Sequence, residues 1–509
     1  MREPTNTGSR FEAHSGPPSA YMFLNSAQAG GNQNRILVAI ANYGMKNVNY
    51  AKQVIGEFRS MPFDVDIVVL SEAPKDYGND VRVLVGLPSK DPWSLPFGHK
   101  KLFAENVDRY DLFIYAEDDT LIRKENILAF LRATHAIGGE FVPGFVRYEL
   151  CCRGKKNYPD VYDHYHWIPG SVRKSGEYTF AKFSNDHAAC YMLTQGQLRE
   201  ALVSGGFLVP PHCGRYDLIC SAGTDPYTQC GFSRIVCFSH LRDFELHHLS
   251  NAYVDRVGLD EDSYKLQTEG LLEIVERKRP REELFVTEKS LATPAWDKSY
   301  YESCRHDIVG LIPPDARDIL SVGCGWGATE VHLREKGKSV MAIPLDSVIG
   351  MLAEEKGISV LPPHFGQALE RLVESRFDVI VLSEVLQHVP FPIEILTKLG
   401  TLLCEHGVLV GSVPNLSLSR RLSGRLLGKS EKFSHMSAPF SKTKLNLTSK
   451  SMIKRWLAAS NLRALDVRYE DYVSSGPLSP LASCLPRAVG TRKIVFVAGP
   501  EPSRVLCRK

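Results

Sequence analysis

A glycine-rich turn between an apolar run and a helical stretch constrains the fold of this chain most. Residues 316–328 read ARDILSVGCGWGA, with glycine at 323, 325 and 327. The apolar run predicts a buried strand, and the spacing from Thr329 to Lys336 predicts a helix. Glycines let the backbone approach a ligand, and the helix N-terminus offers unpaired N–H groups beside it. The turn therefore predicts a ligand-binding strand–turn–helix unit.

Further apolar runs predict a sheet around this turn. They cover residues 339–343, 377–383 and 407–415, followed by two antiparallel strands at 463–469 and 492–498. Together, these elements resemble a class I S-adenosylmethionine-dependent methyltransferase over roughly residues 300–500. The resemblance implies a Rossmann-like seven-stranded domain with S-adenosylmethionine as cofactor. It places the methionine end of the cofactor on Gly323, Gly325 and Gly327.

Three acidic positions that the resemblance implies around the cofactor hold other residues. Ser321 precedes the glycine turn, Pro344 ends the second strand, and His364 lies in a stretch without acids after the third strand. Asp346, two residues after Pro344, is the candidate substitute for the ribose contact. Each lost hydrogen bond to a charged group costs about 1.5–3 kcal/mol. We therefore expect this domain to bind S-adenosylmethionine weakly or not at all.

A second apolar run, in the first half of the chain, ends on three carboxylates. Residues 111–116 predict a short buried strand, and Glu117, Asp118 and Asp119 follow it directly. Adjacent negative charges repel one another, and a hard divalent cation with oxygen ligands relieves that repulsion. The alternatives are a solvated acidic loop or capping residues for the helix predicted at Lys124–Leu131.

Alternating strands and helices lead into this acidic stretch. Residues 34–42 and 63–70 predict strands, and residues 49–59 predict the helix between them. With its acidic signature, the region 34–255 resembles a GT-A type nucleotide-sugar glycosyltransferase. The resemblance implies a Mn²⁺ or Mg²⁺ ion held by Glu117 and Asp119, with a late histidine, His248 or His247, completing the metal shell. Adjacent strand residues face opposite ways, so at most one histidine points at the metal, and we choose His248. The alternative is a pair of surface or capping histidines.

An inverting glycosyltransferase needs a carboxylate near the acceptor hydroxyl to take its proton. Asp225, which precedes Pro226 at a predicted helix start, is the first candidate for this catalytic base, and Asp186 is the second. The alternative role of Asp225 is the N-cap of that helix. The long aromatic segment 157–176 is interpreted as a lid on the acceptor side or as a packed surface loop.

The whole chain is predicted to be an α/β protein with a GT-A-like nucleotide-sugar-binding domain and a Rossmann-like seven-stranded methyltransferase domain. The predicted boundaries are 1–33 for a disordered tail, 34–255 and 300–509 for the two domains, and 256–299 for a linker. The net charge of +3 argues against a nucleic-acid partner. Twelve cysteines without a CxxC pair indicate reduced thiols, and no apolar run reaches the roughly 20 residues that span a bilayer. We therefore expect a cytoplasmic protein.

These features predict a metal-dependent glycosyltransferase that moves a sugar from a nucleotide-sugar donor to a glycan or lipid-linked acceptor. The methyltransferase-like domain would methylate or hold the same glycan, and the resemblance places the reaction in polysaccharide biosynthesis. The alternative is an S-adenosylmethionine-dependent methyltransferase with a non-catalytic carbohydrate-binding module at its N-terminus. Arg420, Arg421 and Arg425, in a predicted insertion at 416–450, suggest peripheral contact with the inner face of a membrane, or else a solvated lid.

Overall fold

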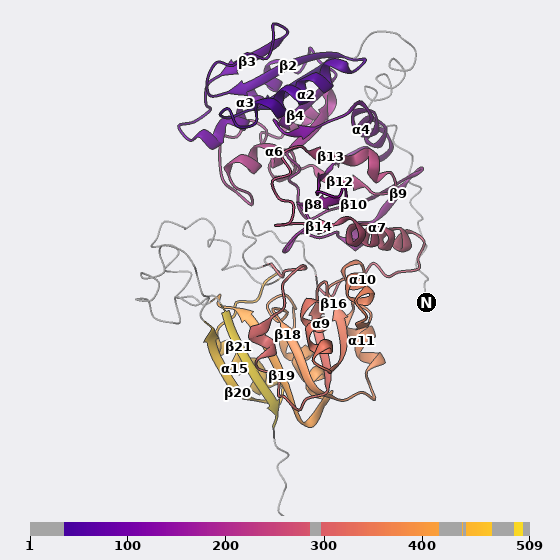
Figure 1. Cartoon of the computed structure of the whole chain (residues 1–509). Coiled ribbons are helices and arrows are strands. Elements are labelled where there is room, and N and C mark those ends of the chain that lie inside the picture. Colours follow the sequence, from indigo (N-terminus) through magenta and orange to yellow (C-terminus); the bar gives the residue numbers. More distant parts are fainter. Residues whose placement is uncertain (1–34, 286–296, 417–439, 441–443, 471–492, 502–509) are drawn as a thin grey trace, which may run out of the picture. The chain divides into compact units, whose positions relative to one another are not determined.

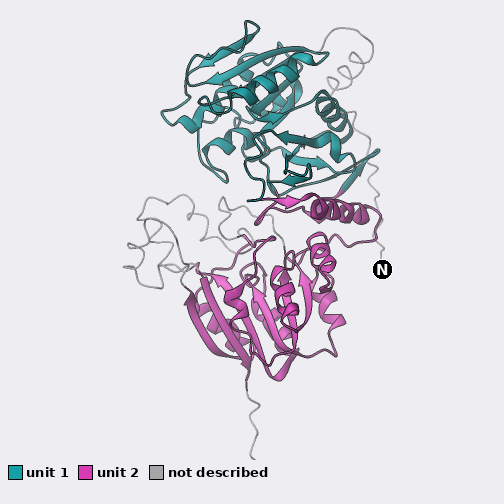
Figure 2. Ribbon diagram, viewed as in Figure 1, with its two compact units in different colours: residues 1–160, 173–256 teal, residues 161–172, 257–509 magenta. Residues whose placement is uncertain are grey.

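The computed structural model describes residues 35–285, 297–416, 440, 444–470 and 493–501. The chain divides into two compact units, the first formed by residues 1–160 and 173–256 and the second by residues 161–172 and 257–509 (Figure 2). The predicted tail and the arginines of the predicted insertion lie outside the described residues. The region predicted as a linker contains a helix, α7 (Glu261–Val275), which belongs to the second unit.

The first unit is built on a five-stranded sheet with the strand order β11-β4-β1-β2-β3 (Figure 1). Its strands are β1 (Arg35–Ala41), β2 (Asp64–Ser71), β3 (Val81–Val85), β4 (Leu112–Glu117) and β11 (Cys190–Thr194). Strands β1 to β4 run parallel, and β11 is antiparallel to β4. β4 is almost entirely buried, as expected for a parallel strand with both faces covered. The three carboxylates therefore lie at the carboxyl end of a central strand.

Smaller strands and several helices complete the first unit. One sheet has the order β6-β12-β10-β9, and another contains β8-β7-β13-β5. The strands are β5 (Thr120–Leu121), β6 (Phe141–Gly144), β7 (Val146–Leu150), β8 (Lys156–Tyr158), β9 (Arg173–Ser175), β10 (Tyr178–Ala181), β12 (Ser233–Cys237) and β13 (Glu245–His248). The helices are α2 (Val48–Ser60), α3 (Gly98–Glu105), α4 (Lys124–Ile137), α5 (Gln195–Val203) and α6 (Leu218–Thr228). β13 pairs with β5 and places His248 opposite Thr120, beside the acidic stretch.

The second unit is built on a seven-stranded sheet with the order β17-β16-β15-β18-β19-β21-β20, which confirms the predicted seven-stranded domain. Its strands are β15 (Asp318–Cys324), β16 (Ser339–Pro344), β17 (Ser359–Val360), β18 (Phe377–Ser383), β19 (Leu403–Pro414), β20 (Leu462–Glu470) and β21 (Lys493–Pro500). β15 to β19 run parallel, and β21 is antiparallel to both of its neighbours, as predicted.

Short helices accompany this sheet, one before its first strand and the others between its strands. They are α8 (His306–Val309), α9 (Ala328–Glu335), α10 (Ser347–Glu355), α11 (Phe365–Arg371), α12 (Pro392–Gly400) and α15 (Lys450–Ala459). Ile308 of α8 and Leu333 of α9 share a core with Ile319, Val379 and Val410 of the sheet. In parallel α/β sheets the ligand edge is the one formed by the carboxyl ends of the strands. The glycine turn after β15 lies on this edge.

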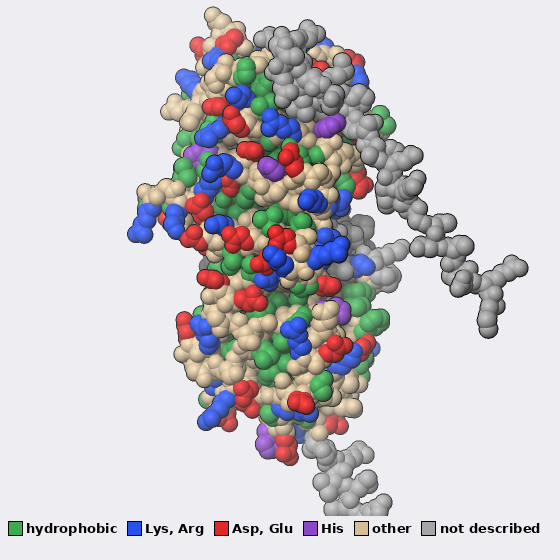
Figure 3. All heavy atoms as spheres, turned by 90° about the vertical axis from the view of Figure 1, so that its right-hand side faces the viewer, with side chains coloured by type: hydrophobic (Ala, Val, Ile, Leu, Met, Phe, Trp, Pro, Cys, Tyr) green, Lys and Arg blue, Asp and Glu red, His purple; other side chains and the backbone are tan. Residues whose placement is uncertain are grey.

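On the face drawn in Figure 3, Lys and Arg side chains alternate with Asp and Glu, in keeping with the small net charge. No helix among the described residues is long and apolar enough to cross a membrane.

Candidate functional site

The glycine turn between β15 and α9 needs its three glycines for two different reasons. Gly323 and Gly327 have φ angles of +83° and +89°, in the left-handed region that glycine tolerates best. Gly325 instead lets the backbone of Tyr300 approach the turn closely, because a Cβ atom at position 325 would overlap the Tyr300 carbonyl. Gly327 is also the N-cap of α9, so the turn ends at a helix N-terminus. This is the backbone arrangement that suits a ligand with negative or polar groups.

The segment Asp297–Arg305 packs on this turn. The Trp326 amide donates a hydrogen bond of 2.9 Å to the Tyr300 carbonyl, and Trp326 Nε1 donates one of 2.6 Å to the Glu302 carbonyl. Buried Lys298 pairs with the Glu302 carboxylate at 2.5 Å. The segment thereby forms one side of the glycine turn and holds Glu302 close to it.

A carboxylate lies beside the turn even though the sequence has Ser321 at the expected acidic position. Ser321 Oγ donates a hydrogen bond of 2.6 Å to Glu330 Oε1, and both residues are buried. Glu330 reaches this place from the first turn of α9, where a carboxylate also interacts favourably with the helix dipole. Glu330 was not among the site residues predicted from the sequence. The sequence does contain a clue to this carboxylate, because Glu330 is an acidic residue in the first turn of the helix predicted after the glycine turn.

Asp346, the predicted ribose ligand, is the N-cap of α10. Its Oδ1 accepts hydrogen bonds from the amides of Val348 at 2.7 Å and Ile349 at 2.8 Å, and the residue is 1% exposed. Burial raises the pKa of its carboxyl to about 7. Pro344 ends β16 and pairs with Cys324. The structure thus assigns Asp346 a capping role, and its contact with a ribose stays a prediction.

Arg305 joins the carboxyl ends of β18 and β19. Its guanidinium donates hydrogen bonds to Ser383 Oγ at 2.6 Å and Ser412 Oγ at 3.0 Å. It also forms ion pairs with Asp307 at 2.7 Å and Glu384 at 3.5 Å. Burial opposes ionisation of Asp307, but the hydrogen bonds and charge of Arg305 lower its pKa to about 2. Arg305 is therefore a buried cation that organises the ligand edge of the sheet.

Glu384 follows β18 at this edge in a strained backbone conformation. Its φ angle is +54°, which is uncommon for a residue other than glycine. Its carboxylate lies 3.5 Å from Lys493 Nζ as well as from Arg305. Strain of this kind is concentrated at ligand sites, where the surrounding structure holds it in place. The sequence analysis singled out neither Arg305 nor Glu384 as a site residue.

The predicted metal ligands of the first unit come together only in part. Asp119 Oδ2 lies 3.1 Å from His248 Nε2, and His248 Nδ1 lies 2.6 Å from the carboxylate of Glu149. Asp118 accepts hydrogen bonds from Asn42 at 2.7 Å and Asn47 at 2.8 Å. His248, and not His247, faces Asp119.

The surroundings of the acidic stretch favour the neutral form of two carboxyls and the charged form of the third. Desolvation raises the pKa of Glu117 to about 7 and that of Asp118 to about 6. The pKa of Asp119 is lowered, because hydrogen bonding and charge from His248 outweigh its burial. Among the described residues, the ligand atoms of these three predicted metal ligands, Glu117, Asp119 and His248, are not all close enough together to hold one metal ion. The role of these residues in holding Mn²⁺ or Mg²⁺ stays a prediction.

The prediction that Asp225 lies at a helix start is wrong. It lies in the last turn of α6, and the N-cap of this helix is Asp217, whose side chain accepts from the amide of Cys220. Asp225 is 0% exposed and pairs with buried Lys100 and with His212, the latter at 3.1 Å. A carboxylate held between two basic groups and closed off from the surface is poorly placed to take a proton from an acceptor. The structure therefore gives no support to Asp225 as a catalytic base.

Asp186, the second candidate base, is half-buried in the loop before β11. Its carboxylate lies 3.9 Å from Arg215 Nη1, and its amide donates a hydrogen bond of 2.8 Å to the Tyr216 hydroxyl. The catalytic role of Asp186 stays a prediction.

His247 faces away from the acidic stretch and stacks on Tyr148, with ring centroids 5.1 Å apart. It lines a cavity of about 370 Å³ with Lys156 and other charged residues.

The aromatic segment predicted as a lid is mostly packed. Tyr165, His166 and Trp167 are buried, whereas Tyr162 is 40% exposed. His166 stacks on Tyr300 with ring centroids 3.7 Å apart, and residues 161–172 belong to the second unit. This supports the alternative of a packed loop, and it adds a second layer behind the segment that covers the glycine turn.

The sequence of the second unit is similar to known methyltransferases. A family described as "Methyltransferase domain" matches residues 296–467. The ubiquinone biosynthesis O-methyltransferase of Nitrosococcus oceani is 36% identical over 142 residues, which cover 25% of this chain and 59% of that protein. The enzyme of the same name from Histophilus somni is 33% identical over 109 residues, covering 19% and 45%. The chain thus spans about half the length of the curated relatives it matches.

Solved structures of methyltransferases also align with the chain. One from Archaeoglobus fulgidus, described as S-adenosylmethionine dependent, is 15% identical and aligns with a TM-score of 0.28 over 38% of this chain and 90% of that one.

Proposed function

We propose that this chain, whose second unit is a class I S-adenosylmethionine-dependent methyltransferase domain, transfers a methyl group from S-adenosylmethionine to a hydroxyl group of an acceptor. The observation that carries the proposal is the turn from β15 into α9, where two glycines take φ angles of +83° and +89° beside a helix N-terminus. The sequence similarity to O-methyltransferases supports the choice of oxygen as the methylated atom.

The residues around the turn suit one end of this cofactor better than the other. The Tyr300 carbonyl occupies the space beside Gly325, so this glycine lets the segment Asp297–Arg305 pack on the turn, and Glu330 adds a buried carboxylate there. S-adenosylmethionine supplies an electrophilic methyl group on a positively charged sulfur. Glu302 and Glu384 at this edge are already paired with Lys298, Arg305 and Lys493. The adenosine end has less support, because Pro344 has no side-chain acceptor and Asp346 caps α10. We therefore expect binding that is specific and weak.

The acceptor class follows from the chemistry of the proposal. A hydroxyl becomes a better nucleophile when a nearby group takes its proton. Glu384 at the ligand edge is held by two cations, Arg305 and Lys493, much as Asp225 is held between two basic groups, so we assign this role to no residue and the proton passes to water. The curated relatives are named for ubiquinone biosynthesis, whereas the first half of this chain resembles carbohydrate-binding enzymes. In our proposal the first unit binds the carbohydrate part of the acceptor without turnover, and the second unit methylates a hydroxyl of the same molecule.

A methyl-transfer assay on the full chain tests this proposal. S-adenosylmethionine labelled in its methyl group is incubated with a panel of glycosides, glycolipids and phenols. We expect a labelled ether product with one acceptor class, lost in Gly325→Ala and kept in the control Gly56→Ala, whose new Cβ meets nothing within 4 Å. Turnover that survives Gly325→Ala, or the absence of product with every hydroxyl acceptor, contradicts the proposal.

A second candidate function, metal-dependent sugar transfer by the first unit, has one observation in its favour. His248 Nε2 lies 3.1 Å from Asp119 Oδ2 at the carboxyl end of β4, the edge where open α/β sheets bind their ligands. A carboxylate and an imidazole are donors that Mn²⁺ accepts. The strand order of the five-stranded sheet, with parallel β1 to β4 and antiparallel β11, is also compatible with a nucleotide-binding unit.

The hydrolysis of nucleotide sugars separates the two candidates. A sugar-transferring unit hydrolyses its donor slowly with Mn²⁺ and loses this activity in Asp119→Asn. Asp108→Asn is the matched control, because Asp108 is an exposed carboxylate just before the opposite end of β4. Metal-dependent hydrolysis that Asp119→Asn abolishes favours the transferase. No hydrolysis of any donor leaves the first unit as a binding module.

A further inference from the structure

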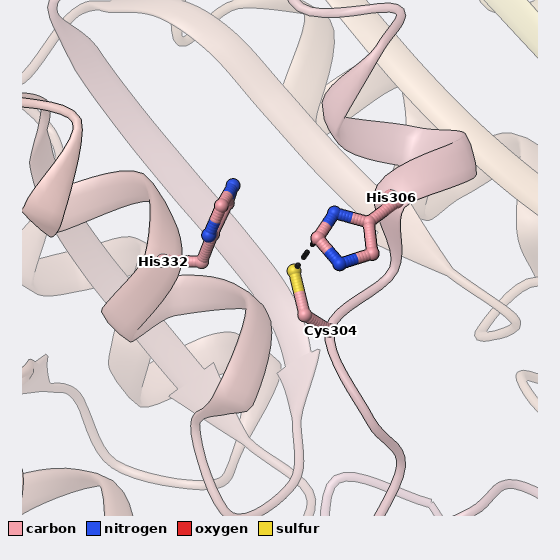
Figure 4. Close-up of side chains that lie close together, drawn as sticks. All are labelled: Cys304, His306 and His332. Carbon is pink, nitrogen blue, oxygen red and sulfur yellow. Dashed lines mark hydrogen bonds between the residues drawn. The ribbon is translucent and has the colours of Figure 1, made fainter.

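A cluster of one cysteine and two histidines lies on the second unit, outside the sheet edge described above. Cys304 Sγ is 3.7 Å from His306 Nδ1, and the rings of His306 and His332 meet edge to face with centroids 5.1 Å apart. One ligand atom from each of the three residues lies within 4.8 Å of the other two. Figure 4 shows the Cys304 thiol between the two imidazoles, with His332 contributed by α9 and His306 by the start of α8.

We propose that Cys304, His306 and His332 bind a divalent transition-metal ion, with zinc as the best fit. Zinc takes thiolate sulfur at about 2.3 Å and imidazole nitrogen at about 2.0–2.1 Å in a tetrahedron, so its ligand atoms lie about 3.4–3.6 Å from one another. The sulfur–nitrogen pair is already close to this separation at 3.7 Å. The third ligand needs only a small side-chain movement to close the remaining distances.

The donor set selects the class of metal. One thiolate with two imidazoles is soft enough to favour Zn²⁺ or Co²⁺ over Mg²⁺ and Ca²⁺, which prefer oxygen ligands. His306 is exposed and the other two residues are half-buried, so a metal could enter from solvent. Three protein ligands leave the fourth position for water.

Cys304 and His306 come from the segment that leads into α8, and His332 comes from α9, so a bound metal would link the segment to this helix. Cys304 and His306 flank Arg305, whose backbone amide donates a hydrogen bond of 3.0 Å to Thr329 Oγ1 of α9. His332 lies one turn further along the same helix. The segment that ends at Arg305 also covers the glycine turn through the Tyr300 and Glu302 carbonyls. A bound metal would therefore fix this cover onto α9, the helix that begins at the turn.

The proposal has a second part, which rests on the proposed function. Because the cover segment forms one side of the proposed cofactor site, metal at Cys304, His306 and His332 should strengthen S-adenosylmethionine binding. A loop that is already ordered before the ligand binds loses less conformational entropy on binding, so the binding free energy is more favourable. We expect zinc to tighten the binding severalfold in the unmodified chain and to have no such effect in Cys304→Ser.

Cobalt titration of the full chain tests the metal site without any cofactor. After treatment with a chelator, one equivalent of Co²⁺ should produce the visible bands of tetrahedral cobalt together with a thiolate-to-cobalt charge-transfer band, and Zn²⁺ should remove both. Cys304→Ser should lose the charge-transfer band, and His332→Gln should weaken cobalt binding at least tenfold. The charge-transfer band also separates this site from Asp119 and His248, which contain no sulfur.

Matched controls come from the same unit. Cys404 is half-buried and His406 is exposed, and neither belongs to the cluster. The variants Cys404→Ser and His406→Gln should keep the whole cobalt spectrum. A charge-transfer band that survives Cys304→Ser, or no band at one equivalent of cobalt, overturns the metal site. An intact cobalt spectrum with no S-adenosylmethionine binding contradicts the proposed function and leaves the metal site standing, whereas cofactor binding that zinc does not change overturns only the coupling.

Discussion

At the residue scale, Asp346 of the second unit is unusual because its carboxyl group is almost fully buried. Its carboxyl caps α10 through two backbone amides, and burial raises its pKa to about 7. The unfolded chain has a carboxyl pKa of about 3.9. Between these values the folded protein holds a proton that the unfolded chain releases, so the free energy of unfolding falls as the pH rises through this window.

Replacing Asp346 with asparagine tests this assignment. Asparagine caps a helix as well as aspartate does but has no charge to bury. We expect Asp346→Asn to raise the free energy of unfolding relative to the unmodified chain at pH 8, with a gain that disappears near pH 4.5. The slope of the difference is at most about 1.4 kcal/mol per pH unit. Urea unfolding at several pH values measures it.

The control for this prediction is Asp260→Asn, which changes the exposed cap of α7. It reports the effect of replacing aspartate by asparagine at a cap outside the buried site. If Asp346→Asn changes stability by the same amount at pH 5 and pH 8, the buried carboxyl does not ionise in this window and the assignment fails.

Single residues were predictable from the sequence where the backbone alone decided their role. Gly323 and Gly327 could be recognised because their left-handed φ angles follow from a turn between a strand and a helix. Glu330 and Asp225 could not be placed, because their roles depend on partners distant in the sequence. Asp225 is held by Lys100, which the sequence puts 125 residues away. A proline following an acid suggested a helix start there, but Pro226 lies inside α6.

At the scale of elements, the contact between the segment Asp297–Arg305 and the glycine turn is the arrangement on which the proposed cofactor site depends. A Cβ at position 325 would overlap the backbone carbonyl of Tyr300, which cannot rotate away as a side chain could. Gly325→Ala should therefore push the segment off the turn and break the hydrogen bond from the Trp326 amide.

Hydrogen exchange measures this displacement. We expect the Trp326 amide to lose protection in Gly325→Ala, with a loss of stability of about 1–3 kcal/mol, the usual cost of overpacking a filled site. Gly56→Ala, in α2 of the first unit, has open space around the new methyl group and should leave the exchange of Trp326 unchanged. Unchanged protection in Gly325→Ala would show that the segment does not rest on the turn.

Several strands of the seven-stranded sheet could be predicted from the sequence more closely than the segments around the sheet. Strand β18 has its predicted bounds, and β20 and β21 have the predicted antiparallel direction, because long apolar runs have few other ways to be buried. The aromatic segment 157–176 was harder, because aromatic rings suit a sugar-binding lid and a packed loop equally well. Contacts such as His166 on Tyr300 decide between these roles, and they join residues far apart in the sequence.

At the scale of the whole molecule, the chain consists of two compact units, each with a hydrophobic core of its own. We expect calorimetry to show two unfolding transitions. A ligand stabilises only the unit that binds it, by about 2.7 kcal/mol at a concentration one hundred times its dissociation constant. S-adenosylmethionine should raise the midpoint of the second unit, and under the second candidate function a nucleotide sugar with Mn²⁺ should raise that of the first.

Substitutions in each unit assign the two transitions. Gly325→Ala should remove only the shift caused by S-adenosylmethionine, and Asp119→Asn should remove only the shift caused by the nucleotide sugar. A single transition that responds to both ligands would contradict the independence of the units. A nucleotide sugar that moves neither transition would contradict the second candidate function, sugar transfer by the first unit.

The central claim is that the glycine turn of the second unit binds S-adenosylmethionine, and isothermal titration calorimetry of the full chain tests it most directly. The missing ribose carboxylate removes about 1.5–3 kcal/mol of binding free energy, a factor of about 10 to 160 in the dissociation constant, so we predict one weak and saturable site. Gly325→Ala should abolish the binding heat, and Gly56→Ala should preserve it. No saturable heat in the unmodified chain, or equal affinity in Gly325→Ala, would contradict the claim.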